Sequence, residues 1–327
     1  MNLDKILVLP GDGIGPSTIG SALAVMNAST DSLEILQGAI GRTAYETTGQ
    51  YLPHETLDLL DECPVILCGP VIPPESGTDP LITLRKQLDL YARVGYFTNL
   101  SPDLGVDGMK AILWGANNNV QEEITEVPDF DGITLNKYIK KHSYNRVMTL
   151  GLSELERKRI KKVTCLTRED FFPISSGMFS ETFDSLFPEE DYEVRHMNVK
   201  DWTAHAVKDP AKEDCIFCVD LYSQVISGIL GSLTGYNHMS PICYIGDEYR
   251  MYSPNHKAVM PDVEEGYANP TSAIVSASLI MEEAGLKEES EAVIRALKGA
   301  YQSGERTPDT GGSLTTKEFT ECVIKRI

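Results

Sequence analysis

Three glycines at alternate positions, Gly11, Gly13 and Gly15, are the first residues of the chain whose type and spacing suggest chemistry. They follow a short apolar run at residues 6–9 and precede a helical pattern that begins at Ser17. Backbone N–H groups in such a turn, with the positive end of the next helix, can bind a phosphate group. The spacing differs from the GxGxxG motif of dinucleotide-binding folds, so a tight strand-to-helix connection explains the turn equally well.

The cysteines suggest a second kind of chemistry. Cys215 and Cys218 have the C-x-x-C spacing that binds zinc or supports thiol redox reactions. They lie in the apolar run 215–219, which predicts a buried strand, and neither a second pair nor a His-x-x-x-His pattern follows. The seven cysteines are odd in number and irregularly spaced, which indicates thiols rather than a disulfide framework. The pattern therefore favours a structural role for the pair.

The elements that must position such residues alternate between strand and helix. Short apolar runs followed by turn-rich segments lie at residues 6–9, 65–68 and 111–114. A strongly helical pattern runs from 268 to 286. Strands separated by helices predict an α/β fold with a mostly parallel sheet. The acidic stretch 121–131 and the basic stretch 137–141 suit an arm or a loop better than a core.

The composition limits the partners of the protein. The chain has 327 residues, of which 42% are hydrophobic and 24% charged, so it can bury a large core and form about two domains. Its 48 acidic and 29 basic residues give a net charge of -19, which repels nucleic acid. No apolar run reaches the roughly 18 residues of a membrane span, and the first residues lack the pattern of a signal peptide. We expect a cytoplasmic protein with neither a nucleic-acid nor a membrane partner.

Five motifs occur in a fixed order along the chain. They are Leu9–Pro16, then Gly69-Pro70 with Leu84–Ala92, then Gly177–Phe183, Ile245–Asp247 and finally Gly266–Thr271. Together they resemble the isocitrate and isopropylmalate dehydrogenase family, the β-decarboxylating dehydrogenases. The resemblance extends over nearly the whole chain and implies the α/β fold of that family.

This resemblance implies a domain arrangement and an activity. Residues 1–99 and 249–327 are expected to form a large domain on the cofactor side, and residues 100–248 a smaller domain with the dimer interface and an arm. Family members form homodimers whose cleft borrows residues from the partner subunit. They oxidise a 2-hydroxy acid with NAD or NADP and then remove its β-carboxylate, with a divalent metal holding the substrate.

The substrate residues of the family are only partly present. The first of its three substrate arginines corresponds to Arg85, while the second corresponds to Gly95, with Arg93 two positions away. The third corresponds to Gly115, and the family tyrosine falls near Glu122. Two arginines and the proton donor are therefore replaced, which predicts a change in the chemistry of the cleft.

The lysine and the metal ligands of the family are also replaced. Arg168 takes the place of the lysine, and because its guanidinium stays protonated it can orient an anion but not act as a base. The three metal-binding aspartates correspond to Lys200, Gln224 and Gly228. A cage for Mg²⁺ or Mn²⁺ needs carboxylates, so we expect no divalent metal. Lys200 could instead take over the role of the cation.

The cofactor side of the resemblance is better preserved. His256 begins a segment similar to the family loop around the adenosine, and Asn269 completes it. Asp262 falls where an acidic residue accepts the ribose hydroxyls and repels a 2′-phosphate, which favours NAD over NADP. Lys257 replaces a family glycine, where its bulk could crowd the cofactor.

Two hypotheses about function follow from these replacements. In the first, the chain is a diverged relative unable to perform metal-dependent oxidative decarboxylation, and Arg85, Arg93, Arg168 and Lys200 bind a small carboxylate or other anion. Such a protein would be non-catalytic or regulatory, as a homodimer or in a hetero-oligomer with an active homologue. In the alternative, it is a metal-independent, NAD-linked oxidoreductase acting on a different hydroxy acid. Arg168 and Lys200 also remain open to interpretation as solvated surface cations.

Overall fold

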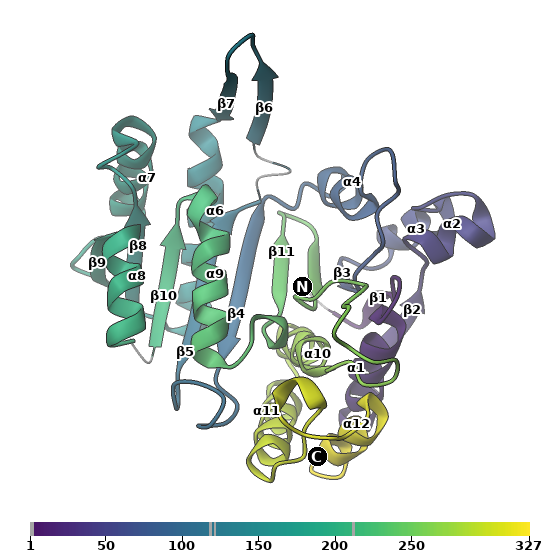
Figure 1. The fold of residues 1–327 in the computed structure, drawn as a ribbon. Helices are drawn as coiled ribbons and strands as arrows, with labels where there is room; N and C mark the ends of the chain where they lie inside the picture. The colour runs from purple at the N-terminus through teal and green to yellow at the C-terminus, as the bar shows by residue number, and fades with distance from the viewer. Residues whose placement is uncertain (1–2, 118–119, 121, 211–212) are drawn as a thin grey trace.

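The computed structural model describes residues 3–117, 120, 122–210 and 213–327 (Figure 1). Its centre is a ten-stranded sheet with the strand order β2-β1-β3-β12-β11-β4-β5-β10-β8-β9. These strands are β1 (Lys5–Leu9), β2 (Glu34–Gln37), β3 (Val65–Cys68), β4 (Ala92–Thr98), β5 (Lys110–Ala116), β8 (Lys162–Thr167), β9 (Glu193–Asn198), β10 (Glu213–Cys218), β11 (Ile242–Ile245) and β12 (Arg250–Ser253). The pairs β12–β11, β11–β4 and β4–β5 are antiparallel and the other neighbours parallel, which confirms a mixed, mostly parallel α/β sheet.

Helices cover both faces of this sheet. They are α1 (Gly15–Ser29), α2 (Arg42–Thr48), α3 (His54–Asp58), α4 (Pro80–Gln87), α6 (Lys141–Lys158), α7 (Pro173–Leu186), α8 (Val199–Lys208), α9 (Asp220–Thr234), α10 (Thr271–Glu283), α11 (Lys287–Gln302) and α12 (Thr316–Ile324). Three short 3₁₀ turns are η1 (Leu59–Asp61), η2 (Asn237–Met239) and η3 (Pro308–Thr310). Among the described residues, no helix is long and apolar enough to cross a membrane.

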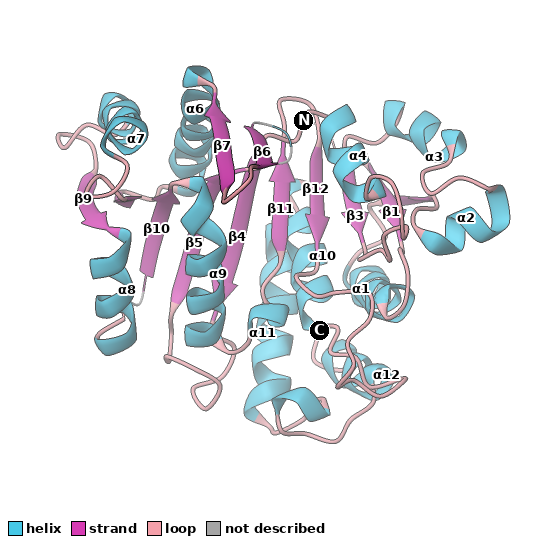
Figure 2. Ribbon diagram, turned by 45° about the horizontal axis from the view of Figure 1, so that its top comes forward, coloured by secondary structure: helices cyan, strands magenta, loops and turns pink. Residues whose placement is uncertain are grey.

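Alternation along the strands divides the core between the two faces. In β3, Val65 and Leu67 join one cluster, whereas Ile66 and Cys68 join another on the opposite face. The first face is covered by α1, α6, α7 and α10 with one continuous cluster. The second face carries two clusters, one beneath α8 and α9 and one beside α4. Figure 2 shows α9 on this second face.

The central stretch of the chain forms a projecting hairpin. Strands β6 (Glu122–Pro128) and β7 (Ile133–Ile139) pair only with each other in a separate two-stranded sheet. Figure 1 shows this hairpin extending beyond the edge of the main sheet. The expected arm is therefore present. Its exposed apolar side chains are Ile124, Val127, Phe130, Ile133, Leu135 and Tyr138.

The strand order bears on the predicted domain boundaries. β11, which the boundary at residue 248 assigns to the small domain, lies between β12 and β4 of the predicted large domain. One sheet thus runs through both predicted domains. The division into 1–99 with 249–327 and 100–248 stays a prediction.

Candidate functional site

A cleft of about 710 Å³ opens beyond the carboxyl ends of β3 and β12. Its walls come from residues 69–73, from α4, from β11 and from the loop 254–259 that follows β12. Parallel strands of an α/β sheet place their ligands at this end, so the position itself indicates a binding site. Arg85 and Lys257 line the cleft, whereas no Asp or Glu is among its described lining residues.

The most unusual group in the cleft is a tyrosine between two arginines. Tyr244 on β11 and Arg93 on β4 are direct partners in an antiparallel ladder, so their side chains share one face. Arg85 approaches from α4, with its Cζ 3.8 Å from the centre of the Tyr244 ring. Burial by itself raises the pKa of the Tyr244 phenol, but the charges of Arg85 and Arg93 and a hydrogen bond from Arg93 outweigh it. The pKa is therefore lowered from its ordinary value of 10.

Arg85 reaches this position because α4 is well anchored. Asp79 caps the helix by accepting a hydrogen bond from the N–H of Leu81 at 2.8 Å, and Pro80 occupies its first turn. Leu84, the residue before Arg85, is buried in the core and anchors the helix. The Nε of Arg85 is buried and has no hydrogen-bond partner among the described residues. Such a group is unfavourable unless an acceptor reaches it, so an acceptor in the cleft would stabilise it.

His256 presents a second unsatisfied atom to the same cleft. Its Nδ1 lies 3.2 Å from the carbonyl oxygen of Lys257. Because a carbonyl can only accept, Nδ1 carries the proton and Nε2 is left as an acceptor. That Nε2 is buried and without a partner in the described part of the chain. Burial lowers the pKa of His256 from 6.5 to about 4, so the ring is neutral near pH 7.

The glycine-rich turn supports the cleft wall from behind. Gly11 and Gly13 have φ angles of +75° and +59°, which favour glycine. A Cβ at Gly11 would lie 2.1 Å from the carbonyl oxygen of Pro70, and one at Gly13 would lie 2.0 Å from that of Ala258. The N–H groups that follow these two glycines donate to the same two oxygens, at 2.8 and 3.0 Å. The turn is therefore a tight connection between cleft segments, and these N–H groups are not available to a phosphate.

Asp12 completes this structural role. Its carboxylate accepts hydrogen bonds from the N–H groups of Arg42, Thr43 and Ile72, each at 2.8 Å. Burial raises the pKa of this carboxyl, but the hydrogen bonds from the three backbone donors and the Thr43 hydroxyl lower it by more. The pKa of Asp12 therefore lies below its usual value. Asp12 thus joins three chain segments as a buried anion.

Neighbouring side chains fill the space beside the two glycines at arginine positions. A Cβ at Gly95 would lie 2.7 Å from the ring of Phe97, and one at Gly115 would lie 3.2 Å from the Cβ of Ser223. The replacement of each arginine is thus accompanied by a side chain packed against the glycine. Restoring either arginine would require these neighbours to move.

Arg168 and Lys200 lie together, away from the cleft. Arg168 forms an ion pair with Asp170, with 3.0 Å between Nε and Oδ1. Asn198 donates to the same Asp170 at 2.6 Å and accepts from the N–H of Lys200 at 2.9 Å, which caps α8. Lys200 itself is exposed. Within one chain, the four predicted anion-binding cations thus form two separate pairs. Arg85 and Arg93 lie at Tyr244, and Arg168 and Lys200 lie at Asn198.

The predicted metal positions carry no carboxylate. Gln224 and Gly228 lie one turn apart on α9, and Gln224 is exposed. In the part of the chain that the structure describes, no three His, Cys, Asp or Glu side chains lie close enough to hold a metal ion. Glu122 begins β6 and pairs with Ile139, but its side chain lies outside the described part of the structure.

Two predicted cofactor residues do not line the cleft. Asp262 is exposed on the turn after it. Asn269 is buried, and its Nδ2 donates to Tyr301 at 3.1 Å and to Asp309 at 2.9 Å. Its Oδ1 accepts from the N–H of Thr271 at 3.0 Å, so the amide is engaged inside the protein. A role for either residue with NAD stays a prediction.

Cys215 and Cys218 do not form a metal pair. Both are buried in β10, but they belong to core clusters on opposite faces of the sheet. All seven cysteines lie in the described residues, and all are thiols rather than disulfides. The structural interpretation of the C-x-x-C spacing is therefore correct.

A cationic cleft at the strand ends of an α/β fold is typical of proteins that bind small ligands. Comparison with known proteins identifies the family within this class. The family model described as isocitrate/isopropylmalate dehydrogenase matches residues 5–107 and 114–323. The chain therefore belongs to the isocitrate/isopropylmalate dehydrogenase family.

Individual relatives agree with this assignment. The 3-isopropylmalate/3-methylmalate dehydrogenase of Methanocaldococcus jannaschii is 29% identical over 99% of both proteins. The homoisocitrate dehydrogenase of the same organism is 25% identical over 99% of this chain and 97% of that protein. The solved structure of isocitrate dehydrogenase from Methylococcus capsulatus has a TM-score of 0.89, at 23% identity and 99% coverage of both chains.

Proposed function

We propose that the cleft binds a small carboxylate together with a nucleotide such as NAD, without a divalent metal and without metal-dependent oxidative decarboxylation. The observation that carries this proposal is the pair of buried, unsatisfied atoms on one cavity, Arg85 Nε and His256 Nε2. The first needs an acceptor and the second a donor. A carboxylate meets the first need and an exocyclic amine of a nucleobase meets the second.

The charge of the cleft supports the carboxylate. Arg85 and Lys257 line the cleft and Arg93 lies beside Tyr244, while no acidic residue is among the lining residues that the structure describes, in a chain with 48 acidic residues. Relatives of the chain are named as dehydrogenases of isocitrate, homoisocitrate and 3-isopropylmalate. These substrates are hydroxy acids with several carboxylates. A ligand of the same chemical class suits this cleft.

The residues present fit a nucleotide cofactor. His256 would accept from the adenine amine, and Lys257, exposed at the cleft wall, would neutralise a phosphate. Asp262 would accept hydrogen bonds from the ribose hydroxyls, which is the role that the family resemblance implies. When NAD is bound, its nicotinamide ring accepts a hydride.

The residues present do not fit the metal of the family. Lys200, Gln224 and Gly228 supply one cation, one amide and no side chain in place of three carboxylates. The function that we propose therefore includes no metal-dependent reaction step. Arg168 and Lys200 would act only in an assembled dimer, where the partner subunit could bring them to the cleft.

A second candidate function is metal-independent oxidation of a hydroxy acid with NAD. The specific observation in its favour is Tyr244, whose phenol has a lowered pKa between two guanidinium groups. This phenol, once ionised, would accept the proton of a substrate hydroxyl, and NAD, when bound, would supply the hydride acceptor. Formation of NADH in EDTA, abolished in Tyr244→Phe, would distinguish this function from simple binding.

We also propose a homodimer. The hairpin β6–β7 exposes six large apolar side chains, between 46% and 101% accessible, which a partner would cover. Light scattering on the purified chain tests this: a mass of two chains agrees with the proposal, and a monomer contradicts it. Co-purification with an active homologue would instead indicate the hetero-oligomer.

The central proposal is tested by thermal shift in EDTA with 3-isopropylmalate, isocitrate, NAD and NADP, singly and in pairs. We expect a carboxylate and NAD each to raise the melting temperature in EDTA. Replacing the EDTA with Mg²⁺ should raise it no further. Stabilisation that appears only with Mg²⁺, followed by NADH formation, would overturn the proposal.

A further inference from the structure

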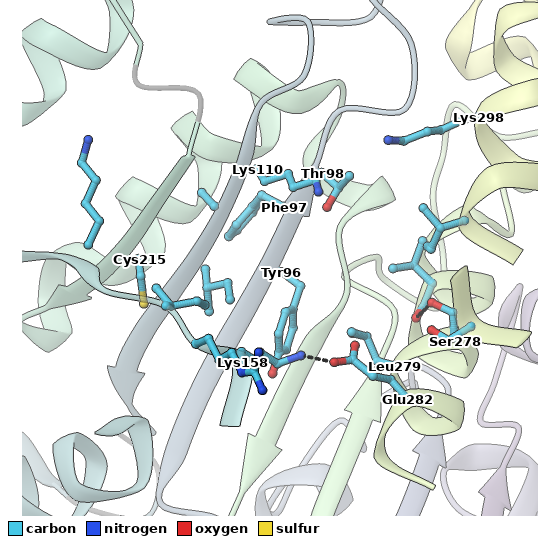
Figure 3. Close-up of a pocket in the computed structure, with 18 of the residues that line it drawn as sticks. Tyr96, Phe97, Thr98, Lys110, Lys158, Cys215, Ser278, Leu279, Glu282 and Lys298 are labelled. Carbon is cyan, nitrogen blue, oxygen red and sulfur yellow. Dashed lines mark hydrogen bonds and ion pairs between the residues drawn. The ribbon is translucent and has the colours of Figure 1, made fainter. Parts of the chain in front are cut away.

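A second cavity, of about 600 Å³, lies on the other face of the sheet from the cleft (Figure 3). Along β4, Arg93 faces the cleft with Tyr244, whereas Tyr96, three residues later, faces this second cavity. The floor is formed by β4 and β5, one wall by the end of α6 and the start of β8, and the other wall by α10 and α11. It is independent of the proposed function of the cleft.

The walls of this back cavity are strongly basic. Six cations line it: Lys110, Lys158, Arg159, Lys161, Lys162 and Lys298. Glu282 is the acidic residue among its described lining residues. In a chain with a net charge of -19, this concentration of positive charge is distinctive. It marks a place where an anion would be attracted.

Several of these cations already have partners. Lys158 forms an ion pair with Glu282 at 2.5 Å, shown as a dashed line in Figure 3. Lys161 lies 4.6 Å from the centre of the Tyr192 ring, and Lys162 is 3.8 Å from Glu193. Lys110, Arg159 and Lys298, in contrast, have no ion pair with the side chains that the structure describes; Lys298 is half-buried and the other two are exposed.

Arg159 occupies an unusual backbone position. It ends α6 with a φ angle of +56°, a conformation that favours glycine at the end of a helix. A cation there also interacts favourably with the helix dipole, but that explanation does not extend to Lys298 on α11. Two elements far apart in sequence thus bring unpaired charge to one cavity.

The arrangement has positive charge at both ends and apolar surface between them. Figure 3 shows Lys298 pointing toward Thr98 and Lys110 at one end, and Lys158 beside Glu282 at the other. Arg159 follows Lys158 in the chain. Tyr96, Ile112 and Leu279 provide apolar surface in the cavity.

We propose that the back cavity binds an elongated organic dianion, with an apolar middle and an anionic group toward Arg159 at one end and Lys298 at the other. Its volume suits a small organic ligand rather than a single inorganic ion. A dicarboxylic acid has this chemistry, whereas a nucleotide such as ADP carries its charge at one end only. The structure therefore assigns a class of ligand, an elongated dicarboxylate.

Calorimetry on the full chain with azelate, ADP and inorganic phosphate tests the proposal. We expect azelate to bind, and Lys298→Gln and Arg159→Gly each to weaken its binding about five-fold. Neither variant should change the binding of ADP, whose phosphates lie at one end of the molecule. Arg159→Gly relieves the backbone conformation, so it should also raise the melting temperature, which separates lost binding from lost stability. Lys287→Gln, on the same helix as Lys298 but outside the cavity, is the matched control and should leave the affinity unchanged.

The ligand results separate the back cavity from the cleft. Azelate binding with this dependence supports the dicarboxylate site, and an unchanged azelate affinity in Arg85→Met shows that the cleft is not responsible. Azelate binding lost in Arg85→Met but kept in Lys298→Gln would contradict the proposal, as would no binding of azelate, equal binding of inorganic phosphate, or ADP binding weakened by Lys298→Gln and Arg159→Gly.

Discussion

The glycine-rich turn and the cleft wall in front of it touch each other but differ in how their polar groups are satisfied. In the turn, the N–H groups after Gly11 and Gly13 bond to protein carbonyls, and the Asp12 carboxylate has three backbone donors. On the cleft wall, Arg85 Nε and His256 Nε2 are buried without a partner among the described residues. The conspicuous motif is thus structural, and the ligand contacts that we propose lie beside it. Buried polar groups without a partner therefore separate a ligand-binding segment from a structural one better than a glycine-rich motif does.

The largest effect that we expect comes from the turn. Gly13→Ala places a Cβ against the carbonyl of Ala258 at a positive φ angle, so it should destabilise the fold by roughly 3–5 kcal/mol. Gly20→Ala is the control, because no atom lies within 4 Å of its added Cβ. That variant sits in α1 and should be neutral or stabilising. Urea denaturation measures both; a mild effect of Gly13→Ala would show that the turn tolerates rearrangement.

His256 provides the next largest effect, through pH. Burial lowers the pKa of its ring from 6.5 to about 4, so the folded state binds fewer protons than the unfolded state between these values. Stability therefore falls as the pH drops from about 6.5 toward 4, by at most about 3 kcal/mol.

Denaturation at several pH values checks this contribution. His256→Gln should remove it from the pH profile, whereas His54→Gln, at an exposed position, should not. Identical profiles for the wild type and His256→Gln would mean that the ring is not buried as neutral imidazole.

Arg85 and Arg168 test the role of unsatisfied cations in binding. Arg85→Met should weaken binding of 3-isopropylmalate by roughly 10- to 100-fold, because a charged hydrogen bond contributes about 1.5–3 kcal/mol. Arg168→Met should weaken it less than Arg85→Met does, since Asp170 already neutralises Arg168. Equal losses in both variants would indicate that the two cationic pairs act together across a dimer.

The smallest expected effect concerns the Tyr244 phenol. Ultraviolet titration should show one tyrosine ionising below the ordinary pKa of 10, and Tyr244→Phe should abolish that transition. Tyr45→Phe, at an exposed position, should leave it in place. Because the phenyl ring still stacks on Arg85, anion affinity should change less than about three-fold. A transition unaffected by Tyr244→Phe would place the lowered pKa elsewhere.

The sequence predicted the fold through alternating strand and helix patterns and through motifs in family order. Arg85 lies in one of these motifs, and Gly95 and Gly115 correspond to family arginines only through that resemblance. Phe97 and Ser223, which pack against those glycines, could not be predicted, because their placement depends on tertiary packing.

Tyr244 was not predicted for the same kind of reason. Its position beside Arg93 results from the antiparallel pairing of β11 with β4, two strands far apart in the chain. By contrast, the partner of Arg168 is only two residues away, so the Asp170 ion pair was within reach of sequence reasoning.

The central claim is that the cleft recognises a carboxylate through Arg85 without a metal. Calorimetric titration of 3-isopropylmalate, once in EDTA and once in Mg²⁺, tests it most directly. We predict the same affinity under both conditions for the wild type, and the same loss under both conditions for Arg85→Met. Binding that disappears in EDTA and returns with Mg²⁺ would contradict the account.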